Sequence, residues 1–262
     1  GETGGGIDIG TSATVSLNNT ILWGNVGAPG GDQIHVGDNS TLASLWLAGC
    51  GPAGEGGQAR FTVVCTTGQV ADLVENVGGE HVEVQALMGP GVDPHLYKAT
   101  PGDRRTLNDA DVVFYNGLHL EGRLAEMLEN LAERRPACAA IEKVRREQPE
   151  LLLEVPGGEG VYDPHYWFDP ALWKLSADFV AEKLAEHDPD HAAAYRENAR
   201  QYAGAIDALA EQCRERIAEI PEGSRVLVTA HDAFGYFGRA YGLEVHGLQG
   251  ISTADEADLG AL

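Results

Sequence analysis

The feature that most constrains the fold is an alternation of short apolar runs with segments of helical periodicity, which begins at residue 61. The apolar runs predict strands, and the periodic segments between them predict helices. Strands that alternate with helices are typical of an α/β fold, in which helices cover the faces of a parallel sheet. The predicted strands span residues 61–66, 81–88, 111–116, 151–155, 225–230 and 244–248, and the predicted helices span 69–77, 101–108, 121–135, 172–187 and 234–241.

One segment interrupts this alternation with a much longer helical pattern. Asp188 and Pro189 form a helix start signal, and Pro221 ends the pattern. A helix of roughly 30 residues is about 45 Å long, which is about the width of a small domain. We therefore expect two α/β lobes, at 61–187 and 222–262, joined by a rigid helix at 188–221. The apolar face of that helix comprises Tyr195, Ala199, Tyr202, Ile206, Leu209, Cys213 and Ile220.

Three histidines fall where α/β proteins bind ligands. The tripeptide Asp-Pro-His occurs twice, ending at His95 and at His165, and His231 follows the apolar run 226–230. His95 and His231 come just after predicted strands, and open α/β sheets bind ligands at the carboxyl ends of their strands. We therefore predict that the three imidazoles share one metal ion. Taken alone, each histidine is more often a structural or surface residue.

Neighbouring polar residues leave two interpretations open. Asp93 and Asp163 can orient an imidazole by accepting a hydrogen bond from its ring, or they can simply cap turns. His119 lies near the same strand ends, but no motif assigns it as a ligand.

The composition narrows the possible functions. The chain has 262 residues and a formal net charge of −22, which argues against nucleic-acid binding, because such proteins carry basic patches. No run of about 18 apolar residues occurs, so no transmembrane helix is expected. The four cysteines include no Cys-x-x-Cys pair, so we expect neither a disulfide framework nor a cysteine zinc site.

The first 60 residues differ from the rest of the chain. Residues 1–44 contain no Lys or Arg, and residues 18–25 resemble a coil of a parallel β-helix. We interpret this segment as a remnant without a role in the main function; an ordinary polar tail is the alternative. Residues 45–60 contain Leu47-Ala48-Gly49-Cys50, which resembles a bacterial lipobox, followed by a glycine-rich tether. We expect Cys50 to carry a lipid anchor, the alternative being a coincidental Ala-Gly-Cys.

The motifs together resemble the zinc- and manganese-binding lipoprotein receptors of bacterial ABC importers, known as cluster A-I. The resemblance covers about residues 61–262 and rests on the segments 89–95, 111–120, 163–170, 231–237 and 247–253, which follow the family's order. It implies that metal is held between two lobes, with His95 and His165 as ligands from the first lobe and His231 as a ligand from the second.

The resemblance has three further implications. A fourth ligand, an aspartate, is expected beyond Leu262, so the chain would be a truncated fragment with an incomplete second lobe. The protein is expected to be a monomer, periplasmic or otherwise extracytoplasmic, and attached to the membrane only through its lipid anchor. It is expected to deliver metal to a permease and its ATPase, without enzymatic activity.

The choice of metal depends on the donor set. Three imidazoles and one carboxylate suit Zn²⁺, whereas Mn²⁺ prefers more oxygen ligands. Some zinc-dedicated members carry a histidine-rich loop, and this chain has no histidine between His119 and His165. The missing loop weakens the prediction of zinc. On the donor set, zinc remains our first prediction, and manganese is our second.

Two other functions are consistent with some of the same residues. Three histidines with an open coordination position could serve a zinc-dependent hydrolase. The sequence contains no His-Glu-x-x-His, no Gly-x-Ser-x-Gly and no P-loop, which argues against this hypothesis. Surface adhesion is the other alternative, since the resemblance extends to adhesive members of the family.

Overall fold

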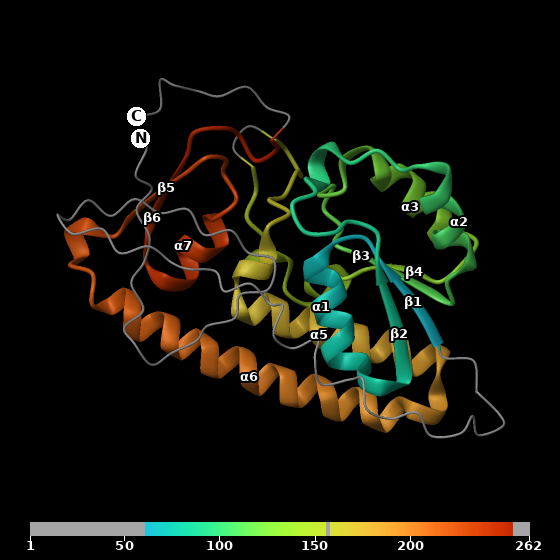
Figure 1. The fold of residues 1–262 in the computed structure, drawn as a ribbon. Helices are drawn as coiled ribbons and strands as arrows, with labels where there is room; N and C mark the ends of the chain where they lie inside the picture. Colours follow the sequence, from blue (N-terminus) through green and yellow to red (C-terminus); the bar gives the residue numbers. More distant parts are fainter. Residues whose placement is uncertain (1–60, 156–157, 254–262) are drawn as a thin grey trace, which may run out of the picture.

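A computed structural model describes residues 61–155 and 158–253. The β-helix-like segment 1–44, the lipobox with Cys50, the tether and residues 254–262 of the predicted second lobe lie outside the described residues. Within the described part, strands and helices alternate as the sequence predicts. Figure 1 shows two sheets side by side, with one long helix running beneath both.

The first sheet has four parallel strands in the order β2-β1-β3-β4. Their bounds are Phe61–Cys65 (β1), Val82–Ala86 (β2), Val112–Tyr115 (β3) and Ala137–Ala139 (β4). The central strands β1 and β3 are buried between two hydrophobic cores, because successive side chains of a strand point to opposite faces. Val63 and Cys65 contribute to one core and Val64 to the other. Val112 and Val113 divide in the same way.

Helices cover both faces of this sheet. The helices on the face of Val63 are α1 (Gly68–Gly78), α4 (Glu142–Glu147) and α5 (Pro170–His187), and those on the other face are α2 (Pro101–Asp109) and α3 (Ala125–Ala132). Two of these helices begin directly after a capping residue. The Thr67 hydroxyl accepts a hydrogen bond from the amide of Val70 in α1, and Asp169 caps α5 just before Pro170.

The long helix α6 (Ala192–Ala218) packs against α5 and α1 and reaches α7. Its 27 residues correspond to about 40 Å. The predicted apolar face is confirmed in its first half, where Tyr195 and Ala199 are buried, whereas Leu209 is exposed in the second half. The helix begins later than predicted because Pro189–His191 forms a separate 3-10 turn, η7.

The second sheet pairs β5 (Val226–Thr229) with β6 (Glu244–Gly247) in parallel, and α7 (Gly235–Tyr241) connects them. This strand–helix–strand order was predicted. None of the helices in the described residues is both long and apolar enough to cross a bilayer. The remaining short 3-10 turns are η2 (Gly79–His81), η3 (Pro94–Leu96), η4 (Gly122–Leu124), η5 (Pro149–Leu151), η6 (Tyr166–Phe168) and η8 (Glu222–Ser224).

Three local predictions were wrong or incomplete. Residues 151–155 form no strand, and only an isolated antiparallel bridge joins Glu154 to Tyr162. The predicted helix 121–135 consists of η4 followed directly by α3, and it starts irregularly because Gly122, the first residue of η4, has a positive φ of 48°. Strand β4 and helix α4 were not predicted, since both are short and lack a clear periodic pattern.

Candidate metal centre

His95 lies in the turn η3, which follows β2. The Asp93 carboxylate fixes this turn, because its Oδ1 accepts a hydrogen bond from the His95 backbone amide at 2.9 Å. The neighbouring η4 turn approaches so closely that a Cβ on Gly122 would collide with the carbonyl oxygen of His95. Gly122 therefore allows the His95 loop to rest directly on the turn that follows β3.

His165 is buried and is oriented by Asp163. The Oδ1 atom of Asp163 accepts hydrogen bonds from the His165 backbone amide at 2.9 Å and from the ring Nδ1 at 2.7 Å. Because Nδ1 carries the proton in this arrangement, Nε2 presents its lone pair on the opposite side of the ring. The two aspartates therefore differ. Asp93 caps a turn, whereas Asp163 both caps a turn and orients an imidazole.

A buried glutamate supports the loop of His165. The Glu121 carboxylate accepts hydrogen bonds from the Thr66 hydroxyl at 2.8 Å and from the Asn116 amide at 2.6 Å. The Asn116 side chain donates in turn to the Pro164 carbonyl, next to His165, at 3.0 Å. Burial raises the pKa of Glu121, and these hydrogen bonds oppose that effect. Sequence reasoning missed Glu121, although an acidic residue between Leu120 and Leu124 was a visible signal.

His231 follows β5 in the second sheet. Its backbone carbonyl accepts a hydrogen bond from the Thr229 hydroxyl at 2.8 Å. A Cβ on Gly247 would lie 2.6 Å from the Cα of Asp232, so this glycine allows β6 to approach the His231 loop. The Nε2 atom of His231 is buried and has no hydrogen-bond partner among the described residues. Burial lowers the pKa of His231 and His165 lowers it further, while Asp93 and Asp163 oppose both effects.

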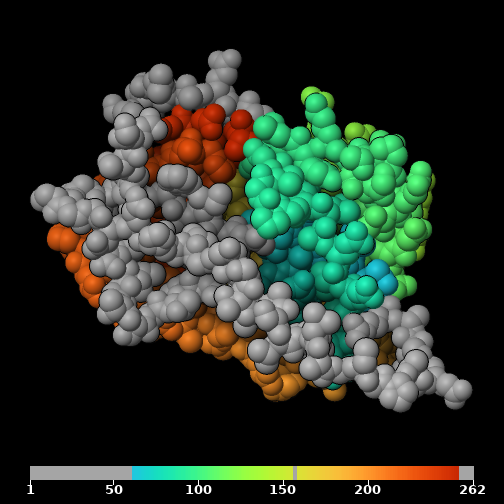
Figure 2. All heavy atoms as spheres, in the orientation of Figure 1, coloured from blue at the N-terminus to red at the C-terminus, as the bar shows by residue number. Residues whose placement is uncertain are grey.

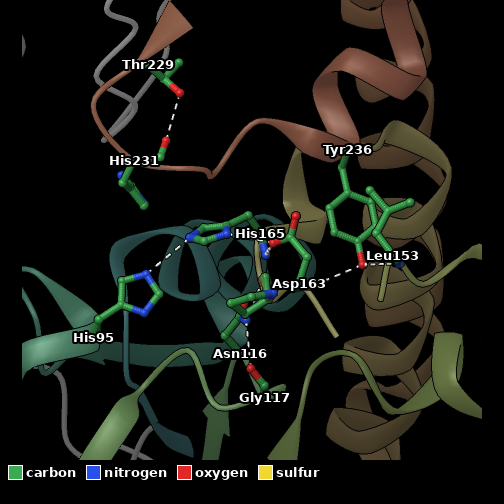
Figure 3. Close-up of polar contacts among 10 residues, drawn as sticks. His95, Asn116, Gly117, Leu153, Asp163, His165, Thr229, His231 and Tyr236 are labelled. Atoms are coloured by element: carbon green, nitrogen blue, oxygen red, sulfur yellow. Dashed lines mark hydrogen bonds and ion pairs between the residues drawn. The ribbon is translucent and has the colours of Figure 1, made fainter. Parts of the chain in front are cut away.

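The three predicted histidines come together at one point (Figure 3). One nitrogen from each ring lies within 4.8 Å of the others. The Nε2 atoms of His95 and His165 are 3.2 Å apart. Two nitrogens that bind the same tetrahedral zinc at about 2.0–2.1 Å are separated by roughly 3.3 Å. The spacing of His95 and His165 is therefore already close to that of a shared metal ion.

Aromatic side chains pack beside His165 and between η6 and the start of α7. The Trp167 ring meets the His165 ring edge-on, with 5.2 Å between the centroids. Phe168 stacks on Phe234 at 4.7 Å, and this pair joins η6 to the start of α7.

The other histidines of the described residues take no part in this cluster. His119 is exposed and adopts a positive φ of 60°. His81 and His191 stack on each other with 4.1 Å between centroids, beside the first turn of α6. Among the described residues, the group of closely spaced metal-binding side chains consists of His95, His165 and His231.

Fold and site together define an α/β protein with two parallel sheets, one long helix and three imidazoles that converge between the sheets. The chain belongs to the family described as "Zinc-uptake complex component A periplasmic", or ZnuA, which matches residues 63–261. The resemblance inferred from the motifs is thereby confirmed.

Two relatives show the extent of the similarity. The chain is 47% identical to the manganese-binding lipoprotein MntA of Bacillus subtilis over 221 residues, which is 83% of this chain and 71% of that protein. It is 46% identical to the zinc-binding protein TroA of Treponema pallidum over 195 residues, which is 74% of this chain and 62% of that protein.

Solved structures confirm the predicted α/β fold class. The periplasmic zinc-binding protein TroA of Treponema pallidum superposes with a TM-score of 0.72 and 43% identity, covering 78% of this chain and 72% of that one. The laminin-binding adhesin Lmb of Streptococcus agalactiae gives a TM-score of 0.66 at 26% identity, covering 76% and 73%.

Proposed function

We propose that this chain is an extracytoplasmic receptor that binds one divalent transition metal through His95, His165 and His231 and hands it to an ABC importer. The observation that carries the proposal is the approach of three imidazole nitrogens to within 4.8 Å of one another. The buried Nε2 of His231 supports it further, because a buried polar atom without a partner costs free energy unless something binds it.

The donor set favours zinc as the cargo. Neutral imidazole nitrogens are good zinc ligands, and the Asp163 carboxylate makes the His165 ring a stronger donor by accepting its Nδ1 proton. A tetrahedral ion needs one donor more than the three that the described residues bring together. Manganese is the second candidate, because one relative is described as a manganese-binding lipoprotein.

The transport role follows from the family. Its description is periplasmic and its named activity is zinc uptake, and several relatives are described as lipoproteins of metal ABC transporters. We propose that the partners are a membrane permease and its ATPase, that the protein acts as a monomer, and that Cys50 carries the lipid anchor. In this role the protein binds and releases its cargo, and no covalent bond is made or broken.

Isothermal titration calorimetry with Zn²⁺ tests the proposal. We expect one zinc site per chain, and the triple change His95→Ala, His165→Ala, His231→Ala should remove it. His119→Ala is the matched control, because His119 is exposed and lies on the turn next to the site. Unchanged affinity in the triple variant would show that zinc binds elsewhere.

Adhesion is a second candidate because one solved relative is described as a laminin-binding adhesin. The measurement that separates the two roles is binding of the metal-free triple variant to immobilised laminin. Binding that survives the loss of all three histidines would support an adhesive role that is independent of metal.

A further inference from the structure

The first half of the molecule, which contains β1–β4, and the second half, which contains β5, α7 and β6, are joined by two groups of hydrogen bonds near the three histidines. On one side, α7 is fastened to the segment that carries His165. The Tyr236 hydroxyl donates to the Asp163 carbonyl at 3.1 Å and accepts from the Leu153 amide at 3.0 Å. Arg239 donates to the Leu151 carbonyl at 2.6 Å and to Asp169 at 2.8 Å. These bonds link the second sheet to His165.

On the other side, the link runs through Asp93. The two oxygens of this carboxylate have different partners: Oδ1 accepts from the His95 amide at 2.9 Å, and Oδ2 accepts from the Thr253 hydroxyl at 2.6 Å. Thr253 comes after β6, so this hydrogen bond spans 160 positions of the sequence. In Figure 2, the red end of the described chain lies directly against the blue-green atoms of the first half.

The segment before Thr253 is fixed to the His231 loop. The Leu248 amide donates to the Thr229 carbonyl at 2.9 Å, and the Gln249 amide donates to the Ala230 carbonyl at 3.0 Å. In the opposite direction, the Asp232 amide donates to the Gln249 carbonyl at 3.2 Å. The His231 loop is therefore connected to His95 by these hydrogen bonds, by the backbone up to Thr253, and by the Thr253–Asp93–His95 contacts.

We propose that the Thr253–Asp93 hydrogen bond is a latch, which holds the His231 loop against the His95 loop and slows the release of bound metal. The inference rests on the proposed function, because it assigns a role in metal release to a residue outside the ligand set. Hydrogen bonds to a carboxylate are about twice as strong as neutral ones, so one such bond can set a release rate. The contacts of α7 keep His165 in place on the other side, so opening the latch separates His95 from His231.

The test is a stopped-flow measurement of zinc release from the loaded chain into an excess of a chromogenic chelator. Thr253→Val removes the hydroxyl and keeps the shape of the side chain, whereas Thr253→Ser keeps the hydroxyl and is the matched control. We expect release from Thr253→Val to be about tenfold faster, which corresponds to about 1.4 kcal/mol, and release from Thr253→Ser to stay within about twofold of the original rate.

The outcomes separate the latch from the proposed function. If the unaltered chain binds one zinc and Thr253→Val releases it no faster, the latch is wrong and the receptor function stands. If Thr253→Ser releases zinc as fast as Thr253→Val, the hydroxyl has no role and the latch is again wrong. If the unaltered chain binds no zinc, both proposals fail together. Melting temperatures of the metal-free variants establish that each one is folded.

Discussion

At the residue scale, the chemistry of the site depends on what touches each imidazole. His165 has a carboxylate on Nδ1, which leaves its Nε2 lone pair for a metal. His231 has an Nε2 that is buried without a hydrogen-bond partner among the described residues. The sequence predicted the three histidines but left the role of the two aspartates open. The reason is that one spacing, Asp-Pro-His, produces a ring contact at Asp163, whereas Asp93 bonds the backbone of His95 and the hydroxyl of Thr253.

The lowered pKa of His231 leads to a prediction about pH and stability. Because burial lowers this pKa, an unfolded chain, with a histidine pKa of about 6.5, binds the proton more readily than the folded chain does. The stability linked to neutral His231 is therefore present above about pH 6.5 and is lost as the pH falls toward the folded-state pKa. We expect the melting temperature of the metal-free chain to fall more steeply between about pH 7 and 5 than that of His231→Gln. Parallel curves for the two chains would contradict this assignment.

At the element scale, the site depends on close backbone contacts, at Gly122 and Gly247, that no sequence pattern predicts. Strands β1 and β3 could be predicted because their valine-rich runs are apolar on both faces. The Glu121 network could not be predicted, since it joins the residues just after β1 and β3 to the His165 loop, and these meet only in the folded chain. Residues 151–155 were misread for a related reason. Their leucines belong to a hydrophobic core, and the backbone groups of Leu151 and Leu153 bond side chains of α7 rather than a neighbouring strand.

The close approach at Gly122 gives a prediction on this scale. Gly122→Ala should destabilise the fold by about 2–3 kcal/mol, because its φ is positive and the added Cβ would meet the His95 carbonyl. Zinc affinity should fall as well, because the His95 loop must move. Gly204→Ala in α6 is the matched control: nothing lies within 4 Å of its added Cβ, so it should stabilise the fold by about 0.5–1 kcal/mol. Chemical denaturation of both variants measures these changes, and equal stability of the two would refute the packing assignment.

At the scale of the whole molecule, α6 runs beneath both parallel sheets (Figure 1), and α7 contacts both α6 and the turn η6 of the first half. The length of α6 was predictable from its periodicity, but the burial of its apolar face was not. Tyr195 and Ala199 are covered by the first sheet and its helices, while Leu209 lies beyond them and is exposed. The hydrogen bond from Thr253 to Asp93 could not be predicted from the sequence either, because no local pattern connects positions so far apart.

In the proposed function, His95, His165 and His231 bind one metal ion together. X-ray absorption at the zinc edge of the loaded chain tests it most directly, because it reports the donor atoms and their distances. We predict three imidazole nitrogens at about 2.0–2.1 Å from the ion, and one fewer for each histidine replaced by alanine. A shell of sulfur, or an imidazole shell that persists in the triple variant, would show that these three histidines do not bind the ion.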